Sequence, residues 1–168
     1  MKGFFAFGFV FGIVSLLLLA PALSAQSISS CDTLITENAV LTNDILLNST
    51  NYEYCLSFAA NNVTLDCHWN AIIGNGSYAS DGYVYLGYPF VGVNAAGVKN
   101  VTIKNCRILG TYTGIVLDST NDSVVFGNVL DRNWFGVHLR ESSNNFVSSN
   151  SMTGALVGIN VRIGVFGN

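Results

Sequence analysis

Two stretches decide the fold: TGIVLDSTNDSVVFGN at residues 113–128 and FGVHLRESSNNFVSSN at residues 135–150, which repeats the same pattern 22 residues later. In each stretch a glycine is followed by alternating apolar residues, and a second apolar segment ends at an asparagine. The glycine recurs through the chain at Gly92, Gly114, Gly136 and Gly158. A short fixed period with alternation every second residue predicts a solenoid whose elements are strands.

This period also predicts columns of equivalent side chains. A strand rises about 3.3 Å per residue, so a repeat of about 22 residues holds three short strands with turns between them. When coils stack at the strand spacing of about 4.8 Å, each strand pairs in parallel with its copy in the next coil. The glycine at each corner is expected to provide either a turn with positive φ or a close approach of two backbones. The predicted inward columns are Val93, Ile115, Val137 and Ile159; Ala95, Leu117, Leu139 and Val161; and Val101, Val124 and Phe146; a stacked asparagine column contains Asn105, Asn128 and Asn150.

Together with NVTLDC at 62–67 and NVTIKNC at 100–106, these strings resemble the repeats of the NosD-like and carbohydrate-binding or sugar-hydrolase β-helix group. The resemblance covers roughly residues 31–168. It implies an all-β fold, the right-handed parallel β-helix. It does not imply one activity, because the group includes lyases, hydrolases, epimerases, a copper-centre accessory protein and many surface proteins.

The N-terminal residues 1–25 have the pattern of a signal peptide. Lys2 provides the positive start, an apolar run follows, and small residues precede Gln26. We therefore predict export of a single β-helix domain, residues 26–168, to the periplasm, the cell surface or the medium. An uncleaved membrane anchor is the alternative. The net charge of −3, without a basic patch, argues against nucleic acid as a partner.

Four cysteines in an exported chain predict disulfides. The preferred bridge joins Cys31 to Cys55 and ties down an N-terminal cap and first coils at residues 31–61. Cys67 and Cys106 occupy nearly equivalent strand ends, and they are expected either to pair or to remain buried thiols. No C-x-x-C pair or histidine cluster accompanies them, so neither a metal site nor a cofactor is predicted.

An insertion interrupts the period between Asn62 and Asn100, where the repeat is 38 residues long. The extra residues lie at 74–89 and are rich in tyrosine. Long loops on rigid scaffolds often carry function, and exposed tyrosines stack on sugar rings. The alternative is that the insertion covers a coil edge or forms a small outward hairpin. The predicted carbohydrate-binding residues are Tyr78, Tyr83, Tyr85 and Tyr88.

Outward positions of the repeat bring together a second candidate site, Asp118, His138 and Arg140. As catalytic residues, the arginine would neutralise a uronate and a base would remove its C5 proton. The alternative is an ordinary surface ion pair between coils, which contributes about 0–1 kcal/mol. Secondary candidates for a sugar-binding surface are His68 beside Trp69, and Arg132 near Trp134.

The leading functional prediction is an exported β-helix domain that is structural or binds a polysaccharide or cell-envelope glycan. The alternatives are a polysaccharide lyase, hydrolase or epimerase, and a NosD-like accessory protein. The signature strings of characterised β-helix enzymes are missing from the sequence, which counts against catalysis. The last coil, residues 158–166, has no polar cap, so further coils or edge-to-edge association are expected at this end.

Overall fold

The computed structural model describes residues 24–46, 53–74, 77–78, 84–85 and 90–162. The predicted signal peptide lies almost entirely outside these residues. Within the described ranges, no helix has the length and apolar character needed to cross a bilayer.

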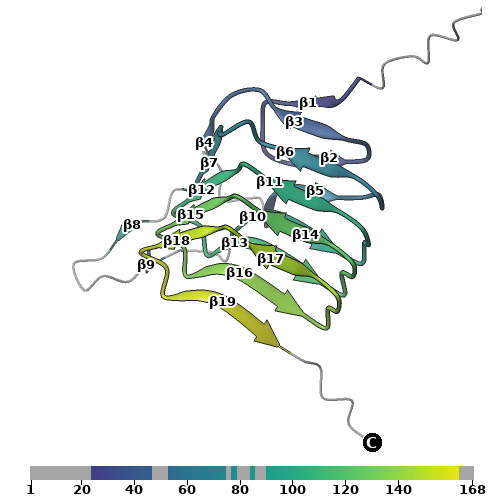
Figure 1. Ribbon diagram of the computed structural model, residues 1–168. Helices are drawn as coiled ribbons and strands as arrows, with labels where there is room; N and C mark the ends of the chain where they lie inside the picture. The colour runs from purple at the N-terminus through teal and green to yellow at the C-terminus, as the bar shows by residue number, and fades with distance from the viewer. Residues whose placement is uncertain (1–23, 47–52, 75–76, 79–83, 86–89, 163–168) are drawn as a thin grey trace, which may run out of the picture.

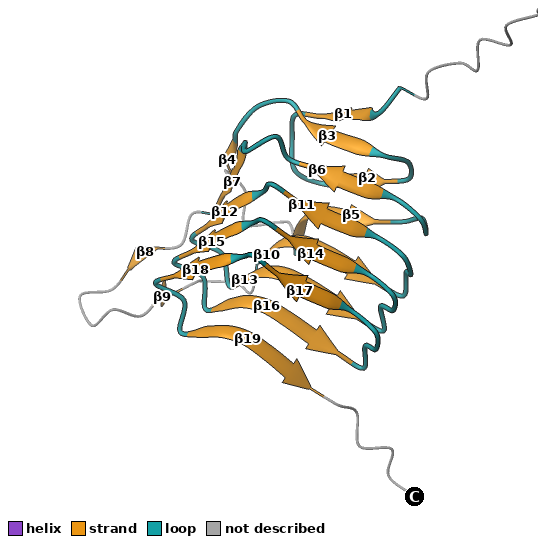
Figure 2. Cartoon of the chain, viewed as in Figure 1, coloured by secondary structure: helices purple, strands orange, loops and turns teal. Residues whose placement is uncertain are grey.

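The chain winds into three sheets in which every pair of neighbouring strands is parallel (Figures 1 and 2). In each regular coil it passes from sheet A to sheet C and then to sheet B. This is the right-handed parallel β-helix that the sequence predicts. Sheet A contains β1 (Gln26–Ile28), β3 (Ala39–Leu41), β6 (Thr64–Asp66), β11 (Thr102–Lys104), β14 (Val124–Phe126) and β17 (Phe146–Ser148). Sheet B contains β2 (Thr33–Ile35), β5 (Tyr54–Phe58), β10 (Val91–Ala96), β13 (Thr113–Asp118), β16 (Phe135–Arg140) and β19 (Val157–Arg162). Sheet C contains β4 (Ile45–Leu46), β7 (Ala71–Ile73), β12 (Arg107–Leu109), β15 (Val129–Asp131) and β18 (Ser151–Thr153).

The tyrosine-rich insertion leaves the solenoid between β7 and β10. Its described backbone forms two short antiparallel strands, β8 (Ser77–Tyr78) and β9 (Val84–Tyr85), which project from the stack of coils in Figure 1. This arrangement matches the outward-hairpin alternative. Tyr83 and Tyr88 fall outside the described residues, and sugar binding by the four tyrosines stays a prediction.

Both predicted inward columns of sheet B are present, because Val93, Ile115, Val137 and Ile159 are register partners, as are Ala95, Leu117, Leu139 and Val161. The predicted third column is wrong. In sheet A, Val124 and Phe146 lie on the outer face, and Phe146 is 62% exposed. Val101 lies in the turn before β11, where its N–H donates to Ser123 Oγ at 3.0 Å. A one-residue shift reverses the face of a strand, and the inward residues of this sheet are Leu65, Ile103, Val125 and Val147.

The predicted asparagine column is correct for two members and wrong for the third. Asn150 Oδ1 accepts hydrogen bonds from the backbone N–H and the Nδ2 of Asn128, each at 2.9 Å. One coil earlier this position belongs to Cys106, whose N–H donates to Asn128 Oδ1 at 2.9 Å. Asn105 lies one residue before it and aligns with Gly127 and Ser149, all with a left-handed backbone at φ 54°, 65° and 53°.

The repeated glycines lie inside strands of sheet B and have no positive φ. The turn role is therefore wrong, and close backbone approach is the correct alternative. A Cβ on Gly114 would lie 2.7 Å from the carbonyl oxygen of Gly136, and one on Gly136 would lie 2.5 Å from that of Gly158. Each glycine makes room for the backbone of the next coil.

We predict that Gly114→Ala and Gly136→Ala each lower the free energy of unfolding by about 1–3 kcal/mol, because the added methyl group has no space. Gly158→Ala is the matched control, since its Cβ would meet Met152 Sδ at an ordinary 3.5 Å. Denaturant unfolding of the three variants measures the difference. Equal losses in all three would contradict the close-approach explanation.

Candidate functional site

A groove of about 330 Å³ lies on the outer face of sheet B. Its floor contains Asn94, Val116 and His138, which are register partners on β10, β13 and β16. Parallel pairing places such partners about 4.8 Å apart along the solenoid axis. The groove therefore follows the stacking direction across successive coils.

One wall of the groove is aromatic. Tyr112, in the turn before β13, lines the groove, and its ring stacks on Trp134 with centroids 5.8 Å apart. Phe135 meets the same ring edge-on at 5.6 Å. Because equivalent corners of neighbouring coils stack, Trp134 supports Tyr112, and this is where the structure places the predicted sugar-binding candidate Trp134. Its predicted companion Arg132 pairs with Asp131 at 3.0 Å.

The other wall is the ion pair between Asp118 and Arg140. The two residues are register partners, and Arg140 Nη2 donates to Asp118 Oδ2. This hydrogen bond lowers the pKa of the Asp118 carboxyl and raises the pKa of the Arg140 guanidinium. The arrangement is the one expected of an ion pair between coils, and the catalytic assignment stays a prediction.

His138 carries an unpaired nitrogen. Its Nε2 is shielded from solvent and has no hydrogen-bond partner among the described residues, and the Phe135 ring lies 5.4 Å from the imidazole. Burial lowers the pKa of His138, and the charges of Arg140 and Arg162 lower it further, against an opposing effect of Asp118. A pKa below the ordinary histidine value of about 6.5 keeps the imidazole mostly neutral at pH 7, so one ring nitrogen can donate and the other can accept a hydrogen bond.

The groove continues toward the N-terminal coils. A second hollow of about 240 Å³ over β2 and β5 shares Glu53 and Tyr54 with the first. Tyr54 Oη donates to Glu53 Oε1 at 2.8 Å, and burial followed by this bond raises the pKa of Tyr54. Sequence reasoning missed both residues because the first coils do not show the 22-residue pattern.

The remaining predicted candidates lie elsewhere. His68 and Trp69 form the turn between β6 and β7, at the corner of sheets A and C, with φ of 48° and 66°. The Asp66 carboxylate holds this turn, because it accepts a 2.9 Å hydrogen bond from the His68 N–H and pairs with Lys104 Nζ at 3.2 Å. Trp69 is 55% exposed there. This pair belongs to a different surface from the groove.

A scan against protein-family models matches residues 26–163 to the family described as periplasmic copper-binding protein (NosD). The chain belongs to the NosD family. The match confirms the resemblance seen in the repeats, and the periplasmic description supports an exported location. Comparisons with curated proteins and with solved structures gave no match.

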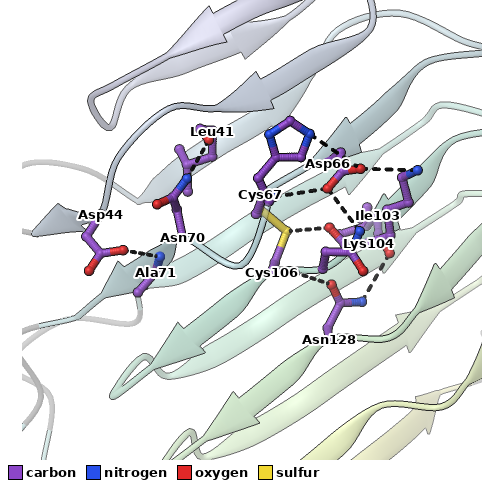
Figure 3. The surroundings of a disulfide bond; sticks show 12 residues. Leu41, Asp44, Asp66, Cys67, Asn70, Ala71, Ile103, Lys104, Cys106 and Asn128 are labelled. Carbon is purple, nitrogen blue, oxygen red and sulfur yellow. Dashed lines mark hydrogen bonds and ion pairs between the residues drawn. A yellow bond between two sulfur atoms is a disulfide. The ribbon is translucent and has the colours of Figure 1, made fainter.

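The copper-binding description of the NosD family requires a test against the donors of this chain. The chain has four cysteines, two histidines and two methionines. All four cysteines are in disulfides, Cys31–Cys55, the pairing favoured from the sequence, and Cys67–Cys106. Figure 3 shows the second bridge among Asp66, Lys104 and Asn128.

The other soft donors are dispersed. His68 and His138 lie on different surfaces, and Met152 packs against the core. Within the described part of the chain, no group of three histidine, cysteine or carboxylate side chains is placed to hold a metal ion. Copper sites require clustered imidazole, thiolate or thioether ligands. The residues that the structure describes therefore do not fit a copper centre.

We expect the oxidised protein to retain less than about 0.1 equivalent of copper after incubation with Cu(I) or Cu(II) and dialysis. Donors that are far apart cannot coordinate one ion together, so only non-specifically bound copper should remain. Metal analysis measures the retained copper. The reduced, unfolded chain is the positive control, because its four free thiols are Cu(I) ligands. One retained equivalent in the oxidised protein would overturn this assessment.

We also predict that His138 titrates below the usual histidine pKa of about 6.5, and that Arg162→Gln raises its pKa by removing a positive charge. The folded protein binds this proton less readily than the unfolded chain, so stability is fully present above the unfolded pKa of about 6.5 and is lost as pH falls from there through the lower folded pKa. NMR titration of the imidazole measures both values. Lys99→Gln, in a turn bordering β10 rather than on β16 or β19, is the charge control.

Proposed function

We propose that this NosD-family chain is an exported glycan-binding protein whose ligand lies in the groove on sheet B. The observation that carries the proposal is the combination of an aromatic wall at Tyr112 with a polar floor at Asn94 and His138. Sugars present an apolar ring face and surrounding hydroxyl groups, and binding sites with few placed polar groups on apolar walls suit such ligands.

The direction of the groove favours a polymer. It spans β2, β5, β10, β13 and β16, which are successive neighbours in sheet B. Four strand spacings of about 4.8 Å give a length of about 19 Å. A binding surface of this length accommodates several linked sugar rings along the solenoid axis.

The tyrosine-rich insertion supports the same location. Strand β7 belongs to sheet C and β10 to sheet B, so residues 74–89 connect these two sheets, and Tyr112 lies in the equivalent connection one coil later. We therefore propose Tyr78, Tyr83, Tyr85 and Tyr88 as a second set of contacts on the aromatic side of the groove.

A polysaccharide-active enzyme is the second candidate. It is favoured by one observation, the neutral imidazole of His138 with its unpaired nitrogen, which suits a general base. The role proposed for Arg140 requires it to leave Asp118, with which it forms an ion pair. Binding without turnover is therefore the better-supported proposal. An accessory role in copper handling rests on the family description alone.

The test measures binding of the purified protein to a panel of neutral, amino and acidic oligosaccharides by calorimetry, with assays for new reducing ends and unsaturated uronates. Tyr112→Ala is expected to weaken binding about tenfold, or about 1.4 kcal/mol. Phe126→Ala removes an exposed aromatic ring from sheet A and serves as the control. Products that disappear in His138→Ala would favour the enzyme, and no binding to any glycan would refute the proposal.

A further inference from the structure

The charges along the groove are unbalanced. Its two hollows are lined by three carboxylates, Asp32, Glu53 and Asp118, and by a single guanidinium, that of Arg140. Arg140 pairs with Asp118. Asp32 and Glu53 therefore remain without a basic partner in the described ranges of the chain.

Glu53 occupies the central position. It lines both hollows, so a ligand that extends from one to the other passes it. The Tyr54 hydroxyl donates to its Oε1, and Oε2 has no hydrogen-bond partner among the residues that the structure describes. A carboxylate beside a phenol ring suits an ammonium group, because the charge receives a hydrogen-bond acceptor and the ring face attracts cations.

An anionic sugar fits this groove poorly. Its carboxylate would approach two carboxylates that have no counter-charge, and the guanidinium in the lining is already paired. Arg162 is the register partner of Arg140 on β19, but it does not line either hollow. The charges therefore discriminate against uronates over the β2–β5 half of the groove.

We infer that the ligand is a glycan with free amino groups, a cationic amino sugar bound with its ammonium group at Glu53. This inference rests on the proposed function and specifies its ligand class. It accounts for the position of an unpaired carboxylate where two hollows meet, and it assigns a role to residues outside the regular repeat.

The test compares three oligosaccharides of equal length with the purified protein: a glucosamine oligomer, its N-acetylated form and a galacturonate oligomer. Calorimetry is performed at a pH at which the amine is protonated. The glucosamine oligomer is expected to bind about tenfold more tightly than the acetylated form, and the galacturonate oligomer is expected to bind most weakly. The difference in affinity between the amino and acetylated forms should shrink in 1 M salt, where the Debye length is about 3 Å.

Glu53→Gln should abolish the preference for the amine by weakening binding of the glucosamine oligomer more than binding of the acetylated oligomer. Glu37→Gln is the matched control, because Glu37 is exposed in the turn between β2 and β3 and lines neither hollow. Circular dichroism verifies that both variants fold.

Equal binding of the amino and acetylated forms, or tighter binding of galacturonate, would overturn the inference and leave glycan binding intact. Retention of the preference in Glu53→Gln would overturn it as well. Equally tight, Glu53-dependent binding of oligolysine would show that the groove attracts any polycation, which also overturns the assignment to a sugar. Absence of binding to every oligosaccharide would refute the proposed function itself.

Discussion

The structure depends on stacking each coil on the next at the spacing of paired strands. Stacking constrains the length and sequence of the turns as well as the core. A side chain in one turn must accept a hydrogen bond from a backbone N–H group of the neighbouring coil. Asn128 Oδ1 accepts from Cys106 N–H, and Asn133 Oδ1 accepts from Thr111 N–H, both at 2.9 Å across 22 residues. Buried backbone groups left without such partners are costly. The repeat length is therefore fixed by hydrogen bonds between turns as well as by the packing of apolar columns.

The same stacking produces the outer surface. Residues at one outward position of sheet B follow one another along the axis, so Asn94, Val116 and His138 become the floor of a groove. Regular coils supply this continuity. The irregular segments add groups that the repeat lacks: the first coils contribute Glu53 and Tyr54 to the groove, and residues 74–89 are inserted in the connection from sheet C to sheet B. A regular scaffold with irregular additions is how one fold supports different ligands.

The NosD family match agrees with the scaffold of this chain, whereas its described residues contain no cluster of metal ligands. The disulfides join neighbouring coils, Cys31 to Cys55 and Cys67 to Cys106, so the cysteines that could hold soft metals serve as covalent links between coils. Carboxylates, tyrosines and one neutral histidine are the groups that this chain presents along its groove.

The sequence by itself determined the period, the parallel stacking and two inward columns of sheet B. It also determined the pairing of Asp118 with Arg140. These features follow from the alternation of residues along a strand and from the equivalence of positions in successive repeats, both of which can be read from short stretches of sequence. It did not determine which face of sheet A is buried. All three residues of β14, Val124–Phe126, are apolar, and the 23-residue interval from Asn105 to Asn128 concealed a shift of one position. Only the tertiary structure decided the groove, because Glu53, Tyr112 and His138 meet through the stacking of coils whose turn lengths differ. Local order specifies each strand, whereas the turns specify which strands become neighbours and in what register.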